Sequence, residues 1–558
     1  MSDLEKQRPW LKNYRLGPYK LARTLEPYPE LPLFTFLDQA AESYPNSTAT
    51  EYFGQRINYR NLKENVDRMA NALFRLGVSK GDKVATILPT SPQFIIANFA
   101  ILKNGAVHVP CSVLHRSSEL EYEIGESGAE TVFCLAEQLD RITALKGKTG
   151  LKNIITTSLA DFTPDEIPLD LPEGALSFNS LLLDHEAAAP RVEINPREDL
   201  AYLAFTGGAT GVPKGVMLTH YNRYVNTMQG MPWALASLEK SVRGKASALI
   251  GVPLFHSYGE ACALFCIYWG LRMILVQDPR HTDLIVRLLV ENRPFLAAMV
   301  PTQLMKLRDH DLPRLPIQIT SGASHLPPDV RESIAEKVKM PVSEVFGLTE
   351  SGPLTHIDLT GFSKITGFAA RQKYSIGLPV PDTDVKLVDD DSGEVCGVEE
   401  AGHMYVRGPQ VMIGYWPEIG SGLVDGWLPT GDIARMDDDG YFYIVDRIKD
   451  MANISGFKVY TSTIDDILHS HPAVSMAAAI GVPDPQREGS ERIKAFIVLK
   501  DDFKGKVDEE EIIEYCREKC ASYAVPRQVE FRDSLPLTVT EKIFKRKLRE
   551  EEVGTTEK

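Results

Sequence analysis

The sequence predicts an α/β fold with a large N-terminal domain and a small α+β C-terminal domain. Strand-like apolar runs alternate with helix-like segments over residues 35–110, and the same rhythm returns over 247–300 and 330–345. This alternation indicates two α/β sheet subdomains with largely parallel strands. After about residue 375, short strand candidates separated by turns replace it. The chain of 558 residues also exceeds what one hydrophobic core usually supports.

The elements of the first subdomain follow from the spacing of apolar residues. Val66, Met69 and Leu73 recur at helical spacing, whereas Val84 begins a short run typical of a buried strand. The expected elements are a helix over 61–76, a strand over 84–88, a helix over 94–102 and a strand over 106–109. Residues 158–197, rich in Pro, Asp and Glu, predict a loop-heavy connection.

The longest apolar stretch, residues 261–276, is interrupted by Arg272 and is too short to span a bilayer. We expect it to form a core helix and a strand. The start of the chain, MSDLEKQRPW, lacks the apolar core of a secretion signal. The sequence therefore predicts a cytoplasmic protein, and it leaves peripheral contact with membranes open.

The C-terminal part changes character in two steps. Strand candidates at 384–387, 403–406 and 441–445 predict a small antiparallel β-barrel or sheet that completes the N-terminal domain. A charged run, residues 446–450, then precedes an α+β pattern. That pattern consists of strands over 477–481 and 495–499 and a helix over 509–520. We expect an N-terminal domain of residues 1–446 and a C-terminal domain of residues 447–558.

Composition excludes some classes of function. A hydrophobic fraction of 43% and a charged fraction of 25% describe an ordinary globular protein, and the net charge of −15 argues against nucleic-acid binding. An anionic substrate then needs a locally positive site. Of the seven cysteines, Cys262 and Cys266, and Cys516 and Cys520, have i,i+4 spacing, but none of them completes a metal-ligand pattern. Free buried thiols are the simpler interpretation.

The strongest local signal is the segment TGGATGVPKGV at residues 206–216, which follows the apolar run 200–205. Glycines let backbone N–H groups approach phosphate oxygens, and two hydroxyls and an ammonium group add donors. Because Lys214 stands between Pro213 and Gly215, the segment is not a common P-loop. It predicts a loop that binds nucleotide phosphates, and a glycine-rich turn without a ligand is the alternative.

Four further motifs carry chemistry, each with a simpler alternative. Glu350, in FGLTE, could hold Mg²⁺ beside the Thr349 hydroxyl, or the two could cap a helix. Asp432 suits ribose hydroxyls, or it forms an Asx turn. Lys542 begins a cluster of basic residues that is otherwise typical of a solvated helix face. His256, in PLFHSYG, is either a functional or a structural histidine.

In this order and at these distances, the motifs resemble the adenylate-forming superfamily of acyl-CoA synthetases, luciferases and peptide-synthetase adenylation domains. The resemblance covers residues 30–550. It is strongest to bacterial long-chain fatty acyl-CoA synthetases, through RPWLKNY at the start, TGG in the phosphate segment, SIGLPVPDTDVKLVDDD at 375–391 and VRGPQVMIGYW at 406–416.

The resemblance implies a reaction in which a carboxylic acid and MgATP give an acyl-adenylate and pyrophosphate, after which CoA releases AMP and forms a thioester. The catalytic residues would be Lys542, Thr349, Glu350 and His256, with Glu350 as the metal ligand. The ATP- and AMP-binding residues would be Thr206, Gly207, Gly208, Ala209, Thr210, Gly211, Lys214, Gly322, Ala323, Ser324, Phe346, Gly347, Thr349, Asp432, Arg447 and Lys542.

The resemblance also implies the remaining sites. The acyl pocket would include His256, Tyr258, Gly259, Thr302, Gly322 and Gly347. CoA would meet Ser455, Gly456, Phe457 and Lys458. The C-terminal domain is expected to rotate at Lys449 between the two steps, which would remove Lys542 and bring in the CoA-binding residues.

The chain departs from the family pattern at a few positions. Ala209 replaces a usual Thr, Thr461 replaces a usual Pro, and Thr463 and Asp465 replace a usual Glu pair. Glu541 replaces the usual Gly before Lys542. None of these changes removes a residue with an essential implied role.

We expect a synthetase for a medium- or long-chain fatty acid. A synthetase for an aromatic or alicyclic acid is the alternative. Two other classes are a nonproductive binder of acyl-adenylate and an enzyme that loads a carrier protein. The implied cofactors are Mg²⁺, ATP and CoA, no nucleic-acid partner is expected, and homodimerisation is left open.

Overall fold

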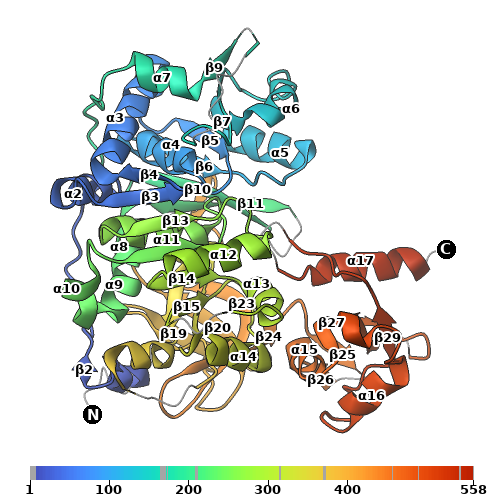
Figure 1. The fold of residues 1–558 in the computed structure, drawn as a ribbon. Coiled ribbons are helices and arrows are strands. Elements are labelled where there is room, and N and C mark those ends of the chain that lie inside the picture. The colour runs from blue at the N-terminus through green and yellow to red at the C-terminus, as the bar shows by residue number, and fades with distance from the viewer. Residues whose placement is uncertain are drawn as a thin grey trace.

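The computed structural model describes residues 8–163, 171–172, 174–207, 212–312, 316–368, 373–454, 457–487, 489–538 and 542–556. A large body formed by the blue to light-orange part of the chain lies beside a smaller unit in deeper orange and red (Figure 1). Two nine-stranded sheets occupy the large body, as the prediction of two α/β subdomains requires. None of the helices in the described ranges combines the length and the apolar character that crossing a bilayer requires.

The first nine-stranded sheet has the order β22-β21-β11-β10-β6-β5-β7-β8-β9. Its strands are β22 Glu418–Ile419, β21 Gly414–Tyr415, β11 Pro213–Thr219, β10 Leu200–Gly207, β6 Val107–Pro110, β5 Lys83–Ile87, β7 Thr131–Leu135, β8 Asn153–Thr157 and β9 Ala175–Ser177. The helices that connect these strands are α3 Tyr59–Arg75, α4 Pro92–Lys103, α5 Ser117–Ser127, α6 Leu139–Thr143 and α7 Phe178–Asp184.

The local sequence explains where these helices begin. The Asn58 side chain accepts a hydrogen bond from the N–H of Asn61 at 2.8 Å and so caps α3. Ser91 caps α4 in the same way, and Pro92 follows at the first helical position, where its missing N–H costs nothing. Since α4 is buried on all sides, its nearly continuous apolar sequence is explained.

The second nine-stranded sheet has the order β18-β17-β16-β15-β14-β12-β13-β3-β4. Its strands are β18 Leu378–Pro379, β17 Leu354–Ile357, β16 Ser343–Gly347, β15 Gln318–Ser321, β14 Leu296–Met299, β12 Ser247–Ile250, β13 Arg272–Leu275, β3 Thr48–Tyr52 and β4 Gln55–Asn58. Its principal helices are α2 Thr35–Ser43, α8 His220–Gln229, α11 Ser257–Tyr268, α12 Thr282–Asn292, α13 Pro301–Arg308 and α14 Pro328–Val338.

Shorter elements complete the large body. They are the strands β1 Arg15–Leu16 and β2 Tyr19–Lys20, the helices α9 Met231–Ala234 and α10 Glu239–Val242, and several 3-10 turns. The apolar stretch 261–276 forms most of α11 and the whole of β13, which confirms the expected core helix and strand.

Of the predicted antiparallel β-barrel or sheet, the barrel is wrong and the sheet is confirmed, because the region forms an open four-stranded antiparallel sheet with the order β19-β20-β23-β24. The strands are β19 Asp384–Val388, β20 Gly402–Arg407, β23 Leu428–Met436 and β24 Phe442–Arg447. The outer strands β19 and β24 do not pair with each other within the described residues. The buried side chains Val385, Leu387, Met404 and Val406 join the core of the large body, so this sheet has no interior of its own to enclose.

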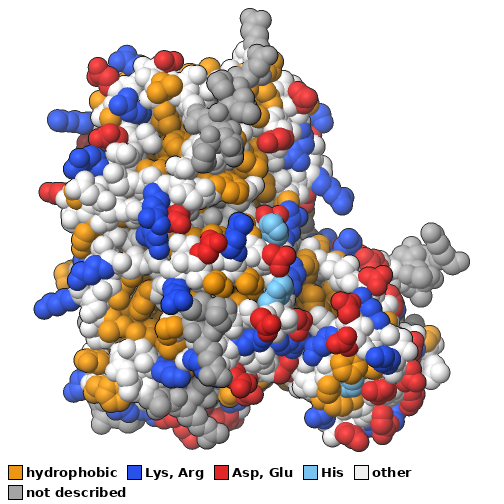
Figure 2. Space-filling model, in the orientation of Figure 1, with side chains coloured by type: hydrophobic (Ala, Val, Ile, Leu, Met, Phe, Trp, Pro, Cys, Tyr) orange, Lys and Arg blue, Asp and Glu red, His pale blue; other side chains and the backbone are white. Residues whose placement is uncertain are grey.

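The small C-terminal unit is α+β, as predicted. It contains β25 Ala452–Ile454, β26 Phe457–Val459, α15 Thr461–His469, β27 Val474–Pro483, β28 Glu491–Leu499, α16 Glu509–Arg517, β29 Gln528–Phe531 and α17 Lys545–Thr556. It has its own core, which extends from Ala452 to Val529. Figure 2 shows acidic side chains gathered on its outer face, where the exposed residues Glu509, Glu510 and Glu511 begin α16. Part of the acidic excess of the chain therefore lies on that face.

Two connecting regions differ from the sequence-based expectation. The connection over 158–197 contains β9 and α7 in addition to loops. The segment 206–216, expected to be a loop, provides the ends of the paired strands β10 and β11, with Lys214 on a strand. Because Pro213 opens β11 and apolar residues follow Gly215, the chain turns back into the sheet sooner than a long phosphate loop would allow.

Candidate functional site

The described parts of the phosphate segment lie on the paired strands β10 and β11. Thr206 and Lys214 are direct partners across the two strands. Gly207 is the last residue of β10, whereas Gly208, Ala209, Thr210 and Gly211 lie outside the described residues. The hairpin therefore presents one hydroxyl and one exposed ammonium group side by side, as a site for anionic oxygens needs.

Glu350 lies directly beside this hairpin. Its Oε1 accepts hydrogen bonds from the Thr206 hydroxyl at 3.2 Å and from the Tyr415 hydroxyl at 3.0 Å. The Lys214 Nζ atom stands 5.0 Å from the centroid of the Tyr415 ring, within the range of a cation–π contact. Burial and the neighbouring Glu350 carboxylate raise the pKa of Tyr415, so its hydroxyl remains a donor. Tyr415 thus links the predicted phosphate and metal residues.

The predicted metal site is compatible with a magnesium ion that arrives with a nucleotide. Among the described residues, no three His, Cys, Asp or Glu side chains gather into a metal-binding group. Mg²⁺ is commonly held by one or two carboxylates together with substrate phosphates and water. Glu350 supplies one such carboxylate next to the phosphate hairpin. Bound there, the ion would neutralise charge on the phosphates.

Thr349 and the residues before it form the second wall of the site. Thr349 begins a 3-10 turn after β16, and its hydroxyl lies 3.1 Å from that of Ser257 at the start of α11. The N-cap of this turn is Leu348, so Thr349 does not cap it. Ala323 has a φ of +76°, a left-handed backbone conformation that is costly for a residue with a side chain. Such strain is often found at functional sites.

Asp432 and Arg447 pair across β23 and β24. The Arg447 Nε atom donates to Asp432 Oδ1 at 3.1 Å. Asp432 is buried, and within the described residues its Oδ2 atom has no hydrogen-bond partner. Burial raises the pKa of Asp432, and Asp432 in turn raises the pKa of Arg447. A buried carboxylate oxygen without a hydrogen-bond donor is chemically suited to accept a hydrogen bond from a ribose hydroxyl.

Lys542 extends from the C-terminal unit into the same site. Its backbone carbonyl accepts a hydrogen bond from the Thr538 N–H at 2.7 Å. Burial, and after it the positive charge of Arg447, lower the pKa of Lys542 to about 8. The negative charges of Asp432 and Glu350 act in the opposite direction. The same groups that were predicted to bind nucleotide therefore surround this ammonium group.

The lowered pKa of Lys542 predicts a pH dependence for the first step. In the free enzyme, kcat/KM for ATP should fall as pH rises through about 8, since the neutral amine no longer attracts phosphate. Pyrophosphate release at increasing pH measures this. Thioester formation from supplied acyl-adenylate serves as the control, because the resemblance implies a role for Lys542 in the first step alone. A Lys542→Arg variant, if active, should lose the alkaline decline, and an unchanged decline in that variant would assign it to another group.

Of the two roles that the sequence left open for His256, the structure shows the structural one. Its Nδ1 atom accepts a hydrogen bond from the N–H of Tyr258 at 3.3 Å, which caps α11. Burial, and secondarily the charge of Lys542, lower the pKa of His256 to about 3. His256 is therefore a neutral capping residue that also lies within electrostatic reach of Lys542.

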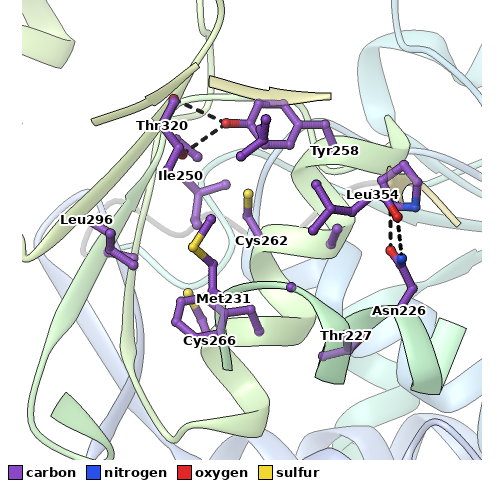
Figure 3. Close-up of a pocket in the computed structure, with 17 residues that line it drawn as sticks. Asn226, Thr227, Met231, Ile250, Tyr258, Cys262, Cys266, Leu296, Thr320 and Leu354 are labelled. Carbon is purple, nitrogen blue, oxygen red and sulfur yellow. Dashed lines mark hydrogen bonds between the residues drawn. The ribbon is translucent and has the colours of Figure 1, made fainter. Parts of the chain in front are cut away.

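An apolar cavity of about 80 Å³ runs along α11. Figure 3 shows Tyr258, Cys262 and Cys266 of α11 along one side, with Met231 and Leu296 across from them. The Tyr258 hydroxyl bonds to Thr320 at the upper end in this view, 3.0 Å from its hydroxyl and 3.2 Å from its carbonyl oxygen. None of the described residues that line the cavity is charged.

Only Tyr258, among the predicted acyl-pocket residues, lines this cavity. His256, Gly259, Thr302, Gly322 and Gly347 do not. Gly322 lies next to it, since a Cβ atom there would stand 3.5 Å from the Tyr258 ring and 2.8 Å from Val345. A Cβ atom at Gly347 would stand 1.7 Å from the Pro353 carbonyl oxygen, so this glycine is required where β17 approaches.

The described CoA-binding candidates lie apart from the Lys542 cluster. Phe457 is 57% exposed and stacks on Tyr523 with ring centroids 4.8 Å apart. Lys458 forms an exposed ion pair with Asp391 at 3.1 Å. Ser455 and Gly456 lie outside the described residues. Lys449 belongs to the turn that follows β24 and leads to the C-terminal unit.

Several residues of this site did not stand out in the sequence. Tyr415 falls within the motif at 406–416, but a lone tyrosine gives no signal of a contact with Glu350. The cavity residues Met231, Cys262 and Cys266 read as ordinary core residues. Helical spacing did place the two cysteines on one face of α11, and that face lines the cavity.

Known proteins share both parts of the chain. Residues 37–416 match the model of the AMP-binding enzyme family, and residues 463–542 match the AMP-binding enzyme C-terminal domain. The chain is 32% identical to a long-chain-fatty-acid–CoA ligase of Bacillus subtilis, over 98% of this chain and 99% of the relative. It is 34% identical to an enzyme of the same name from Escherichia coli O157:H7, over 98% of both chains. A feruloyl-CoA synthase of Amycolatopsis is 31% identical, over 91% of this chain and 96% of that protein.

Solved structures have the same fold. The anthranilate CoA ligase AuaEII, in complex with anthranoyl-AMP, superposes with a TM-score of 0.83 and 26% identity, over 94% of this chain and 98% of that one. A benzoate CoA ligase from Burkholderia xenovorans has a TM-score of 0.80 and 24% identity, over 93% and 100%, which shows a common fold. These findings confirm the resemblance drawn from the motifs. The chain belongs to the AMP-binding enzyme family and is an AMP-forming acid–CoA ligase.

Proposed function

We propose that this enzyme activates a medium- or long-chain fatty acid to its CoA thioester through an acyl-adenylate. The observation that carries the proposal is the uncharged cavity along α11, which begins near Gly322 and ends at Cys266. The eight residue steps from Tyr258 to Cys266 span about 12 Å along a helix. Such a cavity suits a hydrocarbon tail better than a charged one, since burying an unpaired charge is costly.

The polar cluster supports the first step of this reaction. We assign the β,γ-phosphates to the segment from Thr206 to Lys214, and Mg²⁺ to Glu350. Lys542 would bridge the acyl carboxylate and the α-phosphate, where a compact positive charge stabilises the oxygen atoms that gain charge. Asp432 and Arg447 would hold the ribose. Each assignment agrees with the contacts described above.

For the second step we propose a rotation of the C-terminal domain, residues 447–558, at Lys449. In the observed arrangement Lys542 lies in the site, whereas Phe457 and Lys458 contact Tyr523 and Asp391 instead. One site would thus serve two half-reactions through a change in which residues of the mobile domain face it.

An aromatic acid is the second candidate substrate. Three sulfur-containing residues, Met231, Cys262 and Cys266, line the cavity together with Phe265. Sulfur contacts with aromatic rings are favourable. The relatives named above also include a feruloyl-CoA synthase.

The deciding experiment offers straight-chain acids of increasing length and a set of aromatic acids, with ATP and CoA, and measures AMP release. The proposal expects the highest kcat/KM for medium or long chains. A clear preference for aromatic acids would replace it with the second candidate.

Cys262→Phe should shift the preference of the enzyme from long acids toward short acids. Because Cys262 stands one helical turn before Cys266, a phenyl group there would fill the deeper half of the cavity. We expect kcat/KM for long acids to fall by at least roughly tenfold and that for short acids to change little. Cys262→Ala is the matched control and should retain long-chain activity. Equal losses for short and long acids in the Phe variant would show that this cavity does not hold the tail.

A further inference from the structure

Residues 322–324, which the resemblance assigns to ATP and AMP binding, are directly followed by a residue that contacts the C-terminal unit. His325 follows Ser324 in the chain, and its Nε2 atom donates to Asp466 Oδ1 of α15 at 2.8 Å. The two side chains are 37% and 32% exposed, so water can replace the contact when it opens. The bond therefore links the nucleotide segment of one unit to a helix of the other.

A second side chain crosses the same boundary. Arg308, the last residue of α13, donates through Nη1 to Asp329 Oδ2 at 2.8 Å within the large body. Through Nη2 it reaches the carbonyl oxygens of Val474 and Ser475, at 3.3 and 3.4 Å, where β27 begins. Its side chain is only 10% exposed. One guanidinium group is thus fixed on the large body and holds the backbone of the C-terminal unit.

An apolar contact lies beside these polar ones. Met476, two residues after Val474, packs against the core cluster of the large body that contains residues of β15 and α14. In this part of the boundary, the apolar contact of Met476 therefore adds to the directional bonds of His325 and Arg308. The exposed ion pair between Lys458 and Asp391 crosses the boundary elsewhere. Directional bonds specify one orientation, whereas an apolar contact alone would tolerate several.

We propose that His325 and Arg308 form a closure clamp, meaning a pair of positioning residues that hold the C-terminal unit with Lys542 in the active site. Because His325 belongs to the same loop as Gly322 and Ser324, nucleotide bound at that loop would hold the clamp in place. Both bonds must break when the unit rotates at Lys449. The inference rests on the proposed rotation, and it adds the residues that select the first of the two arrangements.

The test is His325→Ala, with the half-reactions measured separately. Pyrophosphate release with acid and ATP should slow by roughly three- to tenfold, as expected for the loss of one hydrogen bond. Thioester formation from supplied acyl-adenylate and CoA should be unchanged or faster, since the competing arrangement loses its support. Arg308→Ala should change the two rates in the same directions. His325→Gln should restore the first rate, because its amide can donate to Asp466 from a similar position.

Lys504→Ala is the matched control, since it removes an exposed ion pair with Asp501 within the C-terminal unit. It should alter neither half-reaction, and thermal unfolding should show that all variants are folded. Equal loss of both half-reactions in His325→Ala, or no loss in either, would overturn the clamp. Failure of the wild type to release pyrophosphate with any acid would instead refute the proposed function. If the wild type completes both half-reactions and these variants change neither rate, the clamp is refuted and the proposed function stands.

Discussion

Lys542→Ala is expected to abolish acid-dependent release of pyrophosphate while leaving thioester formation from supplied acyl-adenylate largely intact. The structure places this ammonium group among Asp432, Arg447 and Glu350, where the α-phosphate would stand. Removing one preorganised group that stabilises developing charge commonly costs about 10²–10³-fold in rate. Pyrophosphate release and thioester formation should therefore be assayed separately on the same preparation.

The nearby exposed Lys547 provides the matched control for this change. Lys547→Ala removes the same charge from the same end of the chain without touching the site, and both half-reactions should proceed at wild-type rates. If Lys542→Ala slowed both steps equally, Lys542 would support the fold of the C-terminal unit and would have no special part in adenylation.

Lys449→Pro is expected to leave adenylation intact and to block thioester formation. Lys449 lies in a turn whose hydrogen bonds are donated by the N–H groups of Asp450 and Met451 to the Arg447 carbonyl, at 2.9 and 3.1 Å. Proline at 449 removes neither bond, so the observed arrangement should survive. It does fix φ near −65°, which denies the backbone the change that rotation needs. Burst release of pyrophosphate, followed by very slow thioester formation, is the expected record.

Lys449→Ala distinguishes loss of rotation from loss of the side chain. It keeps both soft backbone dihedrals and should form thioester at nearly the wild-type rate. Continued turnover with CoA in the proline variant would place the hinge at another residue. Failure of the proline variant to release pyrophosphate would show that the turn itself had been disrupted.

Much of the fold could be predicted because apolar periodicity reports local structure. The helix expected over 61–76 is α3, and the strands expected over 477–481 and 495–499 lie within β27 and β28. The open form of the four-stranded sheet could not be predicted, because closure of a sheet depends on what covers its faces. Here Val385 and Met404 pack into the large body, so the sheet stays open.

The same distinction between local patterns and long-range contacts applies to the residues of the site. Glu350, Asp432 and Lys542 belong to motifs whose spacing marks them, and the structure brings them together. Tyr415 and the cavity residues act through contacts between segments far apart in the chain, and no local pattern reports such contacts. The acyl pocket shows the difference clearly, since glycines such as Gly347 are required by backbone packing and do not line the cavity.

The connection of the C-terminal unit to β24 affects how long the acyl-adenylate stays bound. The turn at Lys449 directly follows β24, the strand that carries Arg447, and β24 pairs with β23, which carries Asp432. Phe442 at the start of β24 is buried in the main core. In the proposed rotation, Asp432 and Arg447, which would hold the ribose, stay fixed. The residues of the C-terminal unit that face them are exchanged. On this proposal the acyl-adenylate would stay bound at Asp432 and Arg447 until CoA arrives. The reactive anhydride would then not be released to water.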